Sequence, residues 1–175
     1  MRINREVVIE DPSPSWVLSP NDRREFRRRV GEMKFPTNYG ANLRGAFAGN
    51  EEASNWPAFL KTHDYHRLLQ DILPVAIIGL GSAELQGAIW SLAKLLRWIC
   101  RKEIGTEDIE RMKIVAAEVI CKLEIALPPS FFDGQIHLLV HLVHEVSMAG
   151  PVHARWMYWV ERYMGYLKSL VRNRA

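Results

Sequence analysis

The chain is poor in cysteine and has no long apolar run, and each absence excludes a class of protein. Its two cysteines, Cys100 and Cys121, are too few for a disulfide scaffold or a four-cysteine zinc site. The longest apolar run, residues 72–83, contains a proline and two glycines and is shorter than the about 20 residues that cross a bilayer. The N-terminus lacks the apolar core of a secretory signal. We therefore expect a soluble intracellular protein, nuclear or cytoplasmic, with no membrane partner.

Familiar catalytic motifs are missing as well. The sequence contains no GxGxxG, GxxxxGK(S/T), HExxH, GxSxG or CxxC. Its net charge, 23 − 20 = +3, is a mild basic excess that does not by itself indicate a nucleic-acid partner. The residues alone therefore predict a helical domain, with a metal-binding or a phosphate-binding surface as open alternatives.

Apolar residues recur with helical spacing from Thr62 almost to the end of the chain, and a similar stripe follows Ser19. No alternating strand pattern appears after residue 20. The predicted fold is all-α, an irregular bundle of five or six helices with a loosely ordered N-terminal arm. We expect the helices to begin near Pro20, Thr62, Ser82, Thr106, Ser130 and Val152, the last one running to about Val171.

Local signals mark several of these helix ends. Ser19, Thr62 and Ser82 are the expected N-caps, because a hydroxyl oxygen accepts hydrogen bonds from the free N–H groups of the first turn. Pro74 is expected to interrupt the helix that begins at Thr62, because proline has no N–H to donate.

Residues 36–61 are rich in glycine and asparagine and contain Pro57. This composition predicts a long irregular connection. We therefore divide the chain into an N-terminal part, residues 1–61, with the arm, a basic helix and this connection, and a helical domain, residues 62–175.

The histidines are the first candidate site. His137 and His141 are spaced i, i+4, and His63 and His66 are spaced i, i+3, so each pair lies on one side of a helix. Paired imidazoles bind zinc in helical sites, and the four together would complete a tetrahedron if the helices meet. The alternative is that these histidines lie at a polar margin or in hydrogen-bonded core positions.

A single carboxylate, Glu161, lies within the apolar and aromatic stretch RWMYWVERYMG. A charge is unexpected there, so Glu161 is a candidate functional residue. The alternative is a structural ion pair with Arg155 or Arg162.

Basic residues gather in two places. The first helix carries Arg23, Arg24, Arg27 and Arg28, and the C-terminal segment carries Lys168 and Arg172. Such residues bind phosphate groups of nucleic acids, which makes DNA a candidate partner. The alternative is a solvated helix face.

Three stretches carry a more specific resemblance. They are LSPNDRREFRRRVGEMKFPTNYGANLRG (18–45), LKTHDYHRLLQDILPVAIIGL (60–80) and ICKLEIALPPSFFDGQIHLLVHLVHEVSMAGPVHARWMYWVERYMGYLKSLVRNRA (120–175). Their motifs include HDxH, LPVAI, PPSFFD, HLLVH, GPV and RWMY. In these motifs the chain resembles the uncharacterised helical domain downstream of the transposase core in plant En/Spm (CACTA) transposon proteins.

The resemblance implies roles for the residues singled out above. Transposases of this class resemble RNase H-like nucleases, in which two aspartates and a glutamate hold two magnesium ions. Glu161 is the implied third carboxylate. His137 and His141 are the implied zinc half-site of the helical insertion, since Glu161 follows His141 by 161 − 141 = 20 residues. The usual CxxC partner is absent, which leaves His63 and His66 as its candidate substitutes.

The two strand-borne aspartates of such nucleases have no counterpart here. We therefore expect a fragment of a transposase that is not an enzyme as an isolated chain and binds magnesium only with the missing catalytic core. Its expected partners are DNA and that core or another protein. The alternative is a stand-alone helical protein-interaction module with an aromatic surface around Trp156, Trp159 and Tyr163, with or without a histidine metal site.

Overall fold

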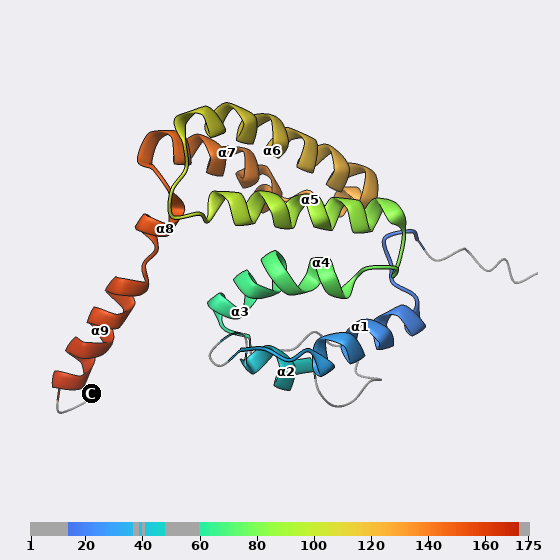
Figure 1. Cartoon of the computed structure of the whole chain (residues 1–175), viewed down its shortest axis with the longest axis horizontal. Coiled ribbons are helices and arrows are strands. Elements are labelled where there is room, and N and C mark those ends of the chain that lie inside the picture. Colours follow the sequence, from blue (N-terminus) through green and yellow to red (C-terminus); the bar gives the residue numbers. More distant parts are fainter. Residues whose placement is uncertain (1–13, 37–38, 40, 48–59, 172–175) are drawn as a thin grey trace, which may run out of the picture.

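A computed structural model of the chain describes residues 14–36, 39, 41–47 and 60–171. Within these ranges all regular secondary structure is helical, which confirms the all-α prediction (Figure 1). The predicted loosely ordered arm falls mostly on residues 1–13, which lie outside the described residues. The same holds for much of the predicted irregular connection.

The described helices outnumber the predicted ones, because short helices occur where the sequence predicted longer helices or an irregular connection. They are α1 (Pro20–Glu32), α2 (Ala41–Phe47), α3 (Thr62–Arg67), the π-helical turn η1 (Leu68–Ile72), α4 (Leu73–Ala76), α5 (Ala83–Ile99), α6 (Thr106–Ala126), the 3₁₀ turn η2 (Pro129–Phe131), α7 (Gly134–Ala149), α8 (Val152–Arg155) and α9 (Tyr158–Leu170). None of the described helices combines the length and apolar character that crossing a membrane requires.

Two of the three expected N-caps are confirmed. The hydroxyls of Ser19 and Ser82 each accept a hydrogen bond from the backbone N–H three residues later, at 3.0 and 3.2 Å. The prediction for Thr62 is wrong, because Thr62 is the first helical residue and Lys61 occupies the cap position. There the carboxylate of Asp64 accepts a hydrogen bond from the backbone N–H of Lys61 at 3.0 Å and closes the first turn.

The prediction that Pro74 interrupts its helix is wrong. The chain passes without a break from α3 through η1 into α4. Immediately before the proline, Leu73 donates its backbone N–H to the carbonyl of Leu68, five residues earlier. This π-type turn accommodates a residue that lacks its own N–H donor.

A second difference is α2, which lies in the segment predicted to be irregular. Leu43 and Phe47, spaced i, i+4, are both buried. Phe47 meets Phe26 of α1 edge-on, with ring centroids 5.9 Å apart. The helix is therefore stabilised by packing against α1, and local helix propensity does not predict such packing.

The core has two clusters of buried apolar side chains, and α5 contributes to both. One cluster joins α5, α6 and α7 around Leu95, Met112 and Val143. The other joins α1, α2, η1, α4 and the first turn of α5. Figure 1 shows α6 and α7 on one side of α5 and α4 on the other. The second cluster combines residues from both sides of the division predicted at residues 61 and 62.

The last predicted helix is broken, contrary to expectation. The backbone of Trp156 is extended, with φ −64° and ψ 138°, and separates α8 from α9. Figure 1 shows α9 projecting from the rest of the molecule. Its described side chains are exposed, apart from the half-buried Val160.

The cluster around α5, α6 and α7 predicts a stability effect. Leu123→Ala should lower the free energy of unfolding by about 2–5 kcal/mol, because Leu123 is 1% exposed and its loss leaves a cavity. Urea denaturation followed by circular dichroism measures the change. Ile125→Ala on the same helix is the control; Ile125 is 75% exposed, so its effect should stay within about 0.5 kcal/mol. Equal losses for both variants would contradict this packing.

Candidate functional site

The apolar face of α9 is uncovered and lies next to a predicted site residue, Glu161. Trp159, Tyr163 and Leu170 are 67%, 56% and 62% exposed. With 3.6 residues per turn, these three side chains fall within about 40° of one another around the helix. The full face consists of Trp159, Val160, Tyr163, Met164, Tyr166, Leu167 and Leu170.

Glu161 lies at the margin of this face, about 60° beyond Met164 on the helical wheel. Its side chain is exposed. The alternative ion pair with Arg155 is not the one formed, since Nη1 of Arg155 lies 3.7 Å from Oε2 of Glu145 instead. Glu161 is therefore accessible to a partner that covers the apolar face of α9.

The predicted pair His137 and His141 lies on the exposed side of α7. The two Nε2 atoms are 3.0 Å apart and the ring centroids 4.7 Å apart. This separation allows one imidazole to donate a hydrogen bond to the other, and it also suits two ligands about 2.0–2.1 Å from a single zinc ion. The pair is thus a two-ligand half-site in geometry.

The second predicted pair does not join the first. His63 and His66 belong to α3, which continues into η1 against α5, whereas α7 packs on α6. In the part of the chain that the structure describes, no group of three or more His, Cys, Asp or Glu side chains could hold one metal ion. The expected four-histidine site is therefore not formed by these residues, because the two pairs belong to different layers of the bundle.

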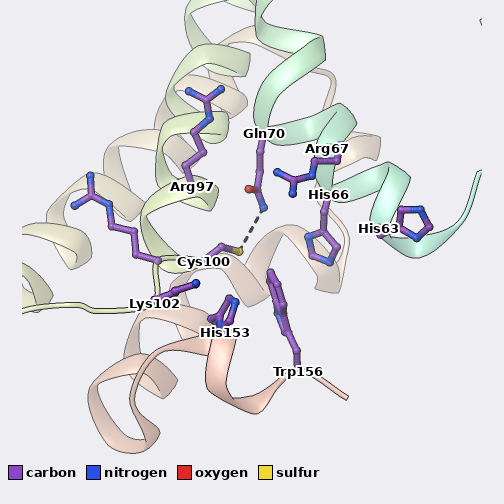
Figure 2. Close-up of a pocket in the computed structure, with 10 residues that line it drawn as sticks. His63, His66, Arg67, Gln70, Arg97, Cys100, Lys102, His153 and Trp156 are labelled. Atoms are coloured by element: carbon purple, nitrogen blue, oxygen red, sulfur yellow. Dashed lines mark hydrogen bonds between the residues drawn. The ribbon is translucent and has the colours of Figure 1, made fainter. Parts of the chain in front are cut away.

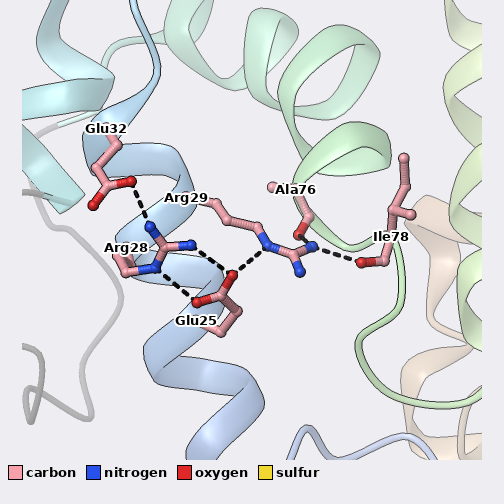
Figure 3. A network of polar contacts seen from close by, with 6 residues as sticks. All are labelled: Glu25, Arg28, Arg29, Glu32, Ala76 and Ile78. Carbon is pink, nitrogen blue, oxygen red and sulfur yellow. Dashed lines mark hydrogen bonds and ion pairs between the residues drawn. The ribbon is translucent and has the colours of Figure 1, made fainter.

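On α1, Arg28 is engaged within its own helix (Figure 3). Its guanidinium pairs with Glu25 at 2.8 Å and with Glu32 at 2.5 Å. Hydrogen bonds from Arg28 and Arg29 lower the pKa of Glu25 to about 2, so this carboxylate stays charged at neutral pH. Much of the positive charge predicted for this face is therefore offset locally.

Arg29 ties α1 to the end of α4. Its Nη1 donates to the backbone carbonyls of Ala76 and Ile78, at 3.1 and 2.5 Å (Figure 3). Its Nε donates to Glu25 at 2.8 Å. These bonds give Arg29 a structural role.

The other predicted basic residues fall into separate groups. Arg23 donates to the carbonyl of Leu18 at 3.1 Å, and Arg24 to the side chain of Asn21 at 2.5 Å. Arg27 is half-buried on α1, and Lys168 is exposed on α9. Figure 1 places α9 at one side of the molecule and α1 toward the other. Arg172 lies outside the described residues.

A cavity of about 460 Å³ brings together residues that sequence reasoning did not combine. Four segments line it: α3, η1, the end of α5 with the following loop, and α8 with Trp156 (Figure 2). The lining residues are His63, His66, Arg67, Gln70, Arg97, Cys100, Arg101, Lys102, His153 and Trp156. In the sequence the one signal was that two of the stretches that carry the resemblance, residues 60–80 and 120–175, contain lining residues.

Asp71 pairs with two of the arginines that line this cavity. Its Oδ1 lies 2.6 Å from Nη2 of Arg97, and its Oδ2 lies 3.5 Å from Nη1 of Arg67. The hydroxyl of Tyr39 donates to the same carboxylate, and Arg67 stacks over the Tyr39 ring at 4.3 Å. Burial raises the pKa of Asp71, but the hydrogen bonds from Tyr39 and Arg97 outweigh it and hold that pKa below its ordinary value.

Two titratable groups in the cavity are neutral at physiological pH. Burial, with a smaller contribution from Arg67, lowers the pKa of His66. Burial also raises the pKa of the Cys100 thiol, although Gln70 donates a hydrogen bond to its Sγ at 3.4 Å. The cavity therefore owes its charge to arginine and lysine side chains, and its thiol is not a ready nucleophile.

The geometry of the half-site on α7 predicts weak zinc binding. Isothermal titration with zinc chloride should show binding that is lost in His137→Ala and in His141→Ala, because each variant leaves one imidazole. His63→Ala should bind zinc as the wild type does, since α3 belongs to a different layer. Zinc binding that survives in both α7 variants would rule out the half-site.

Residues 99–175 match the model of a family described as Domain of unknown function (DUF4218). The match begins at the last residue of α5 and spans α6 to α9. It therefore includes the half-site, the apolar face of α9 and five of the ten residues that line the cavity. A search of curated proteins found no match. A search of solved structures found none either.

Proposed function

We propose that this chain is a helical domain of a CACTA (En/Spm-type) DNA transposase that works by docking α9 onto a catalytic core. One observation carries the proposal. The helix α9 leaves the bundle with its apolar face uncovered and with Glu161 at the margin of that face.

The exposed side chains of α9 are of the type that interfaces bury. Tryptophan and tyrosine, the residue types of Trp159 and Tyr163, often contribute most of the binding energy of a protein interface. An amphipathic helix commonly docks by laying its apolar face into a groove. A contiguous apolar patch on a soluble protein commonly marks such a contact. We therefore assign the apolar face of α9 to a protein partner.

The position of Glu161 favours a transposase core as that partner. If a core covers the apolar face of α9, Glu161 lies at the edge of the interface. There its carboxylate can approach metal-binding aspartates of the core. In nucleases of this class a bound magnesium pair activates the attacking oxygen and stabilises the phosphorus centre. In the proposal, Glu161 supplies one carboxylate oxygen to that site, and the core supplies the two aspartates.

The proposal predicts that the chain alone does not cut DNA. A single carboxylate such as Glu161 does not hold two magnesium ions against water. DNA would be a partner of the joined protein, whose place of action would be the nucleus.

A reconstitution experiment tests the role of Glu161. The chain is mixed with a core fragment of an En/Spm-type transposase that carries the two aspartates, and magnesium-dependent cleavage of terminal-repeat DNA is measured. Wild-type chain should restore cleavage. Glu161→Gln should still bind the core but abolish cleavage, since the amide keeps the shape and loses the charge. Glu118→Gln, an exposed carboxylate on α6, is the matched control and should cleave normally.

Binding to the core fragment tests the apolar face of α9 separately. Trp159→Ser combined with Leu170→Ser should weaken binding by more than tenfold, because truncating buried interface anchors costs about 2 kcal/mol or more each. Ile114→Ser with Ile125→Ser removes two apolar side chains from α6 that are 62% and 75% exposed, and it should leave binding unchanged. Equal effects of the two pairs would contradict docking through α9.

The alternative, a stand-alone protein-interaction module, uses the same exposed aromatic residues. It is favoured if the chain never binds a transposase core but forms oligomers in light scattering that Trp159→Ser with Leu170→Ser dissolves. A monomer that binds no core would exclude both functions.

A further inference from the structure

We infer that the cavity lined by α3, α5 and α8 binds the phosphate group of a nucleotide, either free or within a nucleic-acid strand. The inference goes beyond the proposed function, because it uses neither α9 nor a catalytic core. It rests on the charge, the arrangement and the aromatic content of the cavity.

The charge of the cavity is strongly asymmetric. Four of the ten lining side chains are permanent cations, Arg67, Arg97, Arg101 and Lys102, and none is a carboxylate. Among the residues that the structure describes, the carboxylates paired with lining residues are Asp71, described above, and Asp64, whose Oδ1 lies 3.3 Å from Nε2 of His63. Counting only arginine, lysine and carboxylate side chains, the balance is 4 − 2 = +2. Such a surplus attracts an anion.

The side chains converge from separate segments on one space. Figure 2 shows Gln70 reaching down to Cys100, Arg67 pointing sideways toward Gln70, and Lys102 below Cys100. Arg97 points away from this space toward Asp71. Guanidinium, ammonium and amide N–H groups are the donors that phosphate oxygens accept most strongly.

An aromatic group completes the cavity beside these donors. The Trp156 ring lies 5.5 Å from the His66 ring and 5.2 Å from the His153 ring, centroid to centroid. Flat rings next to cations suit a nucleobase attached to a phosphate, since stacking of a base on an aromatic side chain contributes about 1–3 kcal/mol. The volume of about 460 Å³ lies within the range of small-ligand sites.

A metal ion is the less favourable occupant of this cavity. His66, Cys100 and His153 are ligand types, but among the described residues no three such side chains are placed to hold one ion. The neighbouring Arg67 and Lys102 would also repel a dication. The same cations attract a phosphate.

Charge reversal tests the inference. Fluorescence anisotropy measures binding of labelled single-stranded and duplex oligonucleotides, and isothermal titration measures binding of AMP and inorganic phosphate. Arg101→Glu with Lys102→Glu should weaken the binding of phosphate ligands by more than tenfold. For oligonucleotides, the slope of log affinity against log salt concentration should fall by about 1 for each cation that contacts phosphate. Both side chains are exposed, so the variant should fold, and circular dichroism checks this.

The control carries the same change of charge elsewhere. Lys113→Glu with Lys122→Glu replaces two exposed lysines of α6 and should leave the affinities within about twofold, since these side chains do not line the cavity. A second variant, Trp156→Leu, should weaken binding of AMP and single strands but not of inorganic phosphate, because only the first two carry a base.

The outcomes separate the two sources of phosphate. If Arg101→Glu with Lys102→Glu loses oligonucleotide binding and the α6 control keeps it, the site binds a nucleic-acid strand. Loss of AMP binding, with no oligonucleotide bound by the wild type, assigns it to a free nucleotide. Absence of any binding by the wild type, or equal losses in the cavity variant and the α6 control, overturns the inference. Neither of these results bears on docking through α9, since no core fragment is present.

Discussion

Two-sided burial of α5 is the constraint on which the rest of the structure depends. Ala88, Leu95 and Ile99 face the cluster shared with α6 and α7, whereas Leu85 belongs to the cluster shared with α1, α2 and α4. A helix with apolar side chains on two sides must pack against other helices on both sides, because leaving either apolar side in water costs free energy. The layers of the bundle follow from this requirement.

Both candidate functional regions arise where this packing stops. Beyond the end of α5 the chain exposes cations at positions 101 and 102, and α3 and α8 bring their own polar side chains to the same place. Trp156 then leaves the helical conformation while its ring lies beside His66 and His153, which separates α9 from the bundle. Trp156 thus lines the cavity with its ring, and its extended backbone separates α8 from α9, the helix that carries Glu161. The cavity and α9 are neighbours in the fold, because Trp156 lines the first and lies just before the second.

The sequence predicted best what neighbouring residues decide among themselves. The hydroxyls of Ser19 and Ser82 cap their helices because the partner N–H lies three residues away. His137 and His141 meet because a helical turn brings positions i and i+4 together. Two of the errors are local, namely the cap at Lys61 and the π-type turn before Pro74. The two larger errors involve contacts between residues that are distant in the sequence. The helix α2 forms because Phe47 packs on Phe26, and the final helix breaks at a tryptophan that packs against α3.

By itself the sequence determined the helical class, most helix starts, and the spacing that places Glu161 beside an apolar stripe. These properties follow from a period of 3.6 residues and from the chemistry of the caps, which act over one turn. Only the tertiary structure decided that His63 and His66 do not join the α7 pair, and that Arg29 donates to the backbone carbonyl of Ala76 in α4. It also decided that residues near positions 66, 100 and 153 line one cavity. The physical reason is that the mutual placement of helices depends on how their buried surfaces fit, and that fit is a property of whole faces rather than of any local pattern.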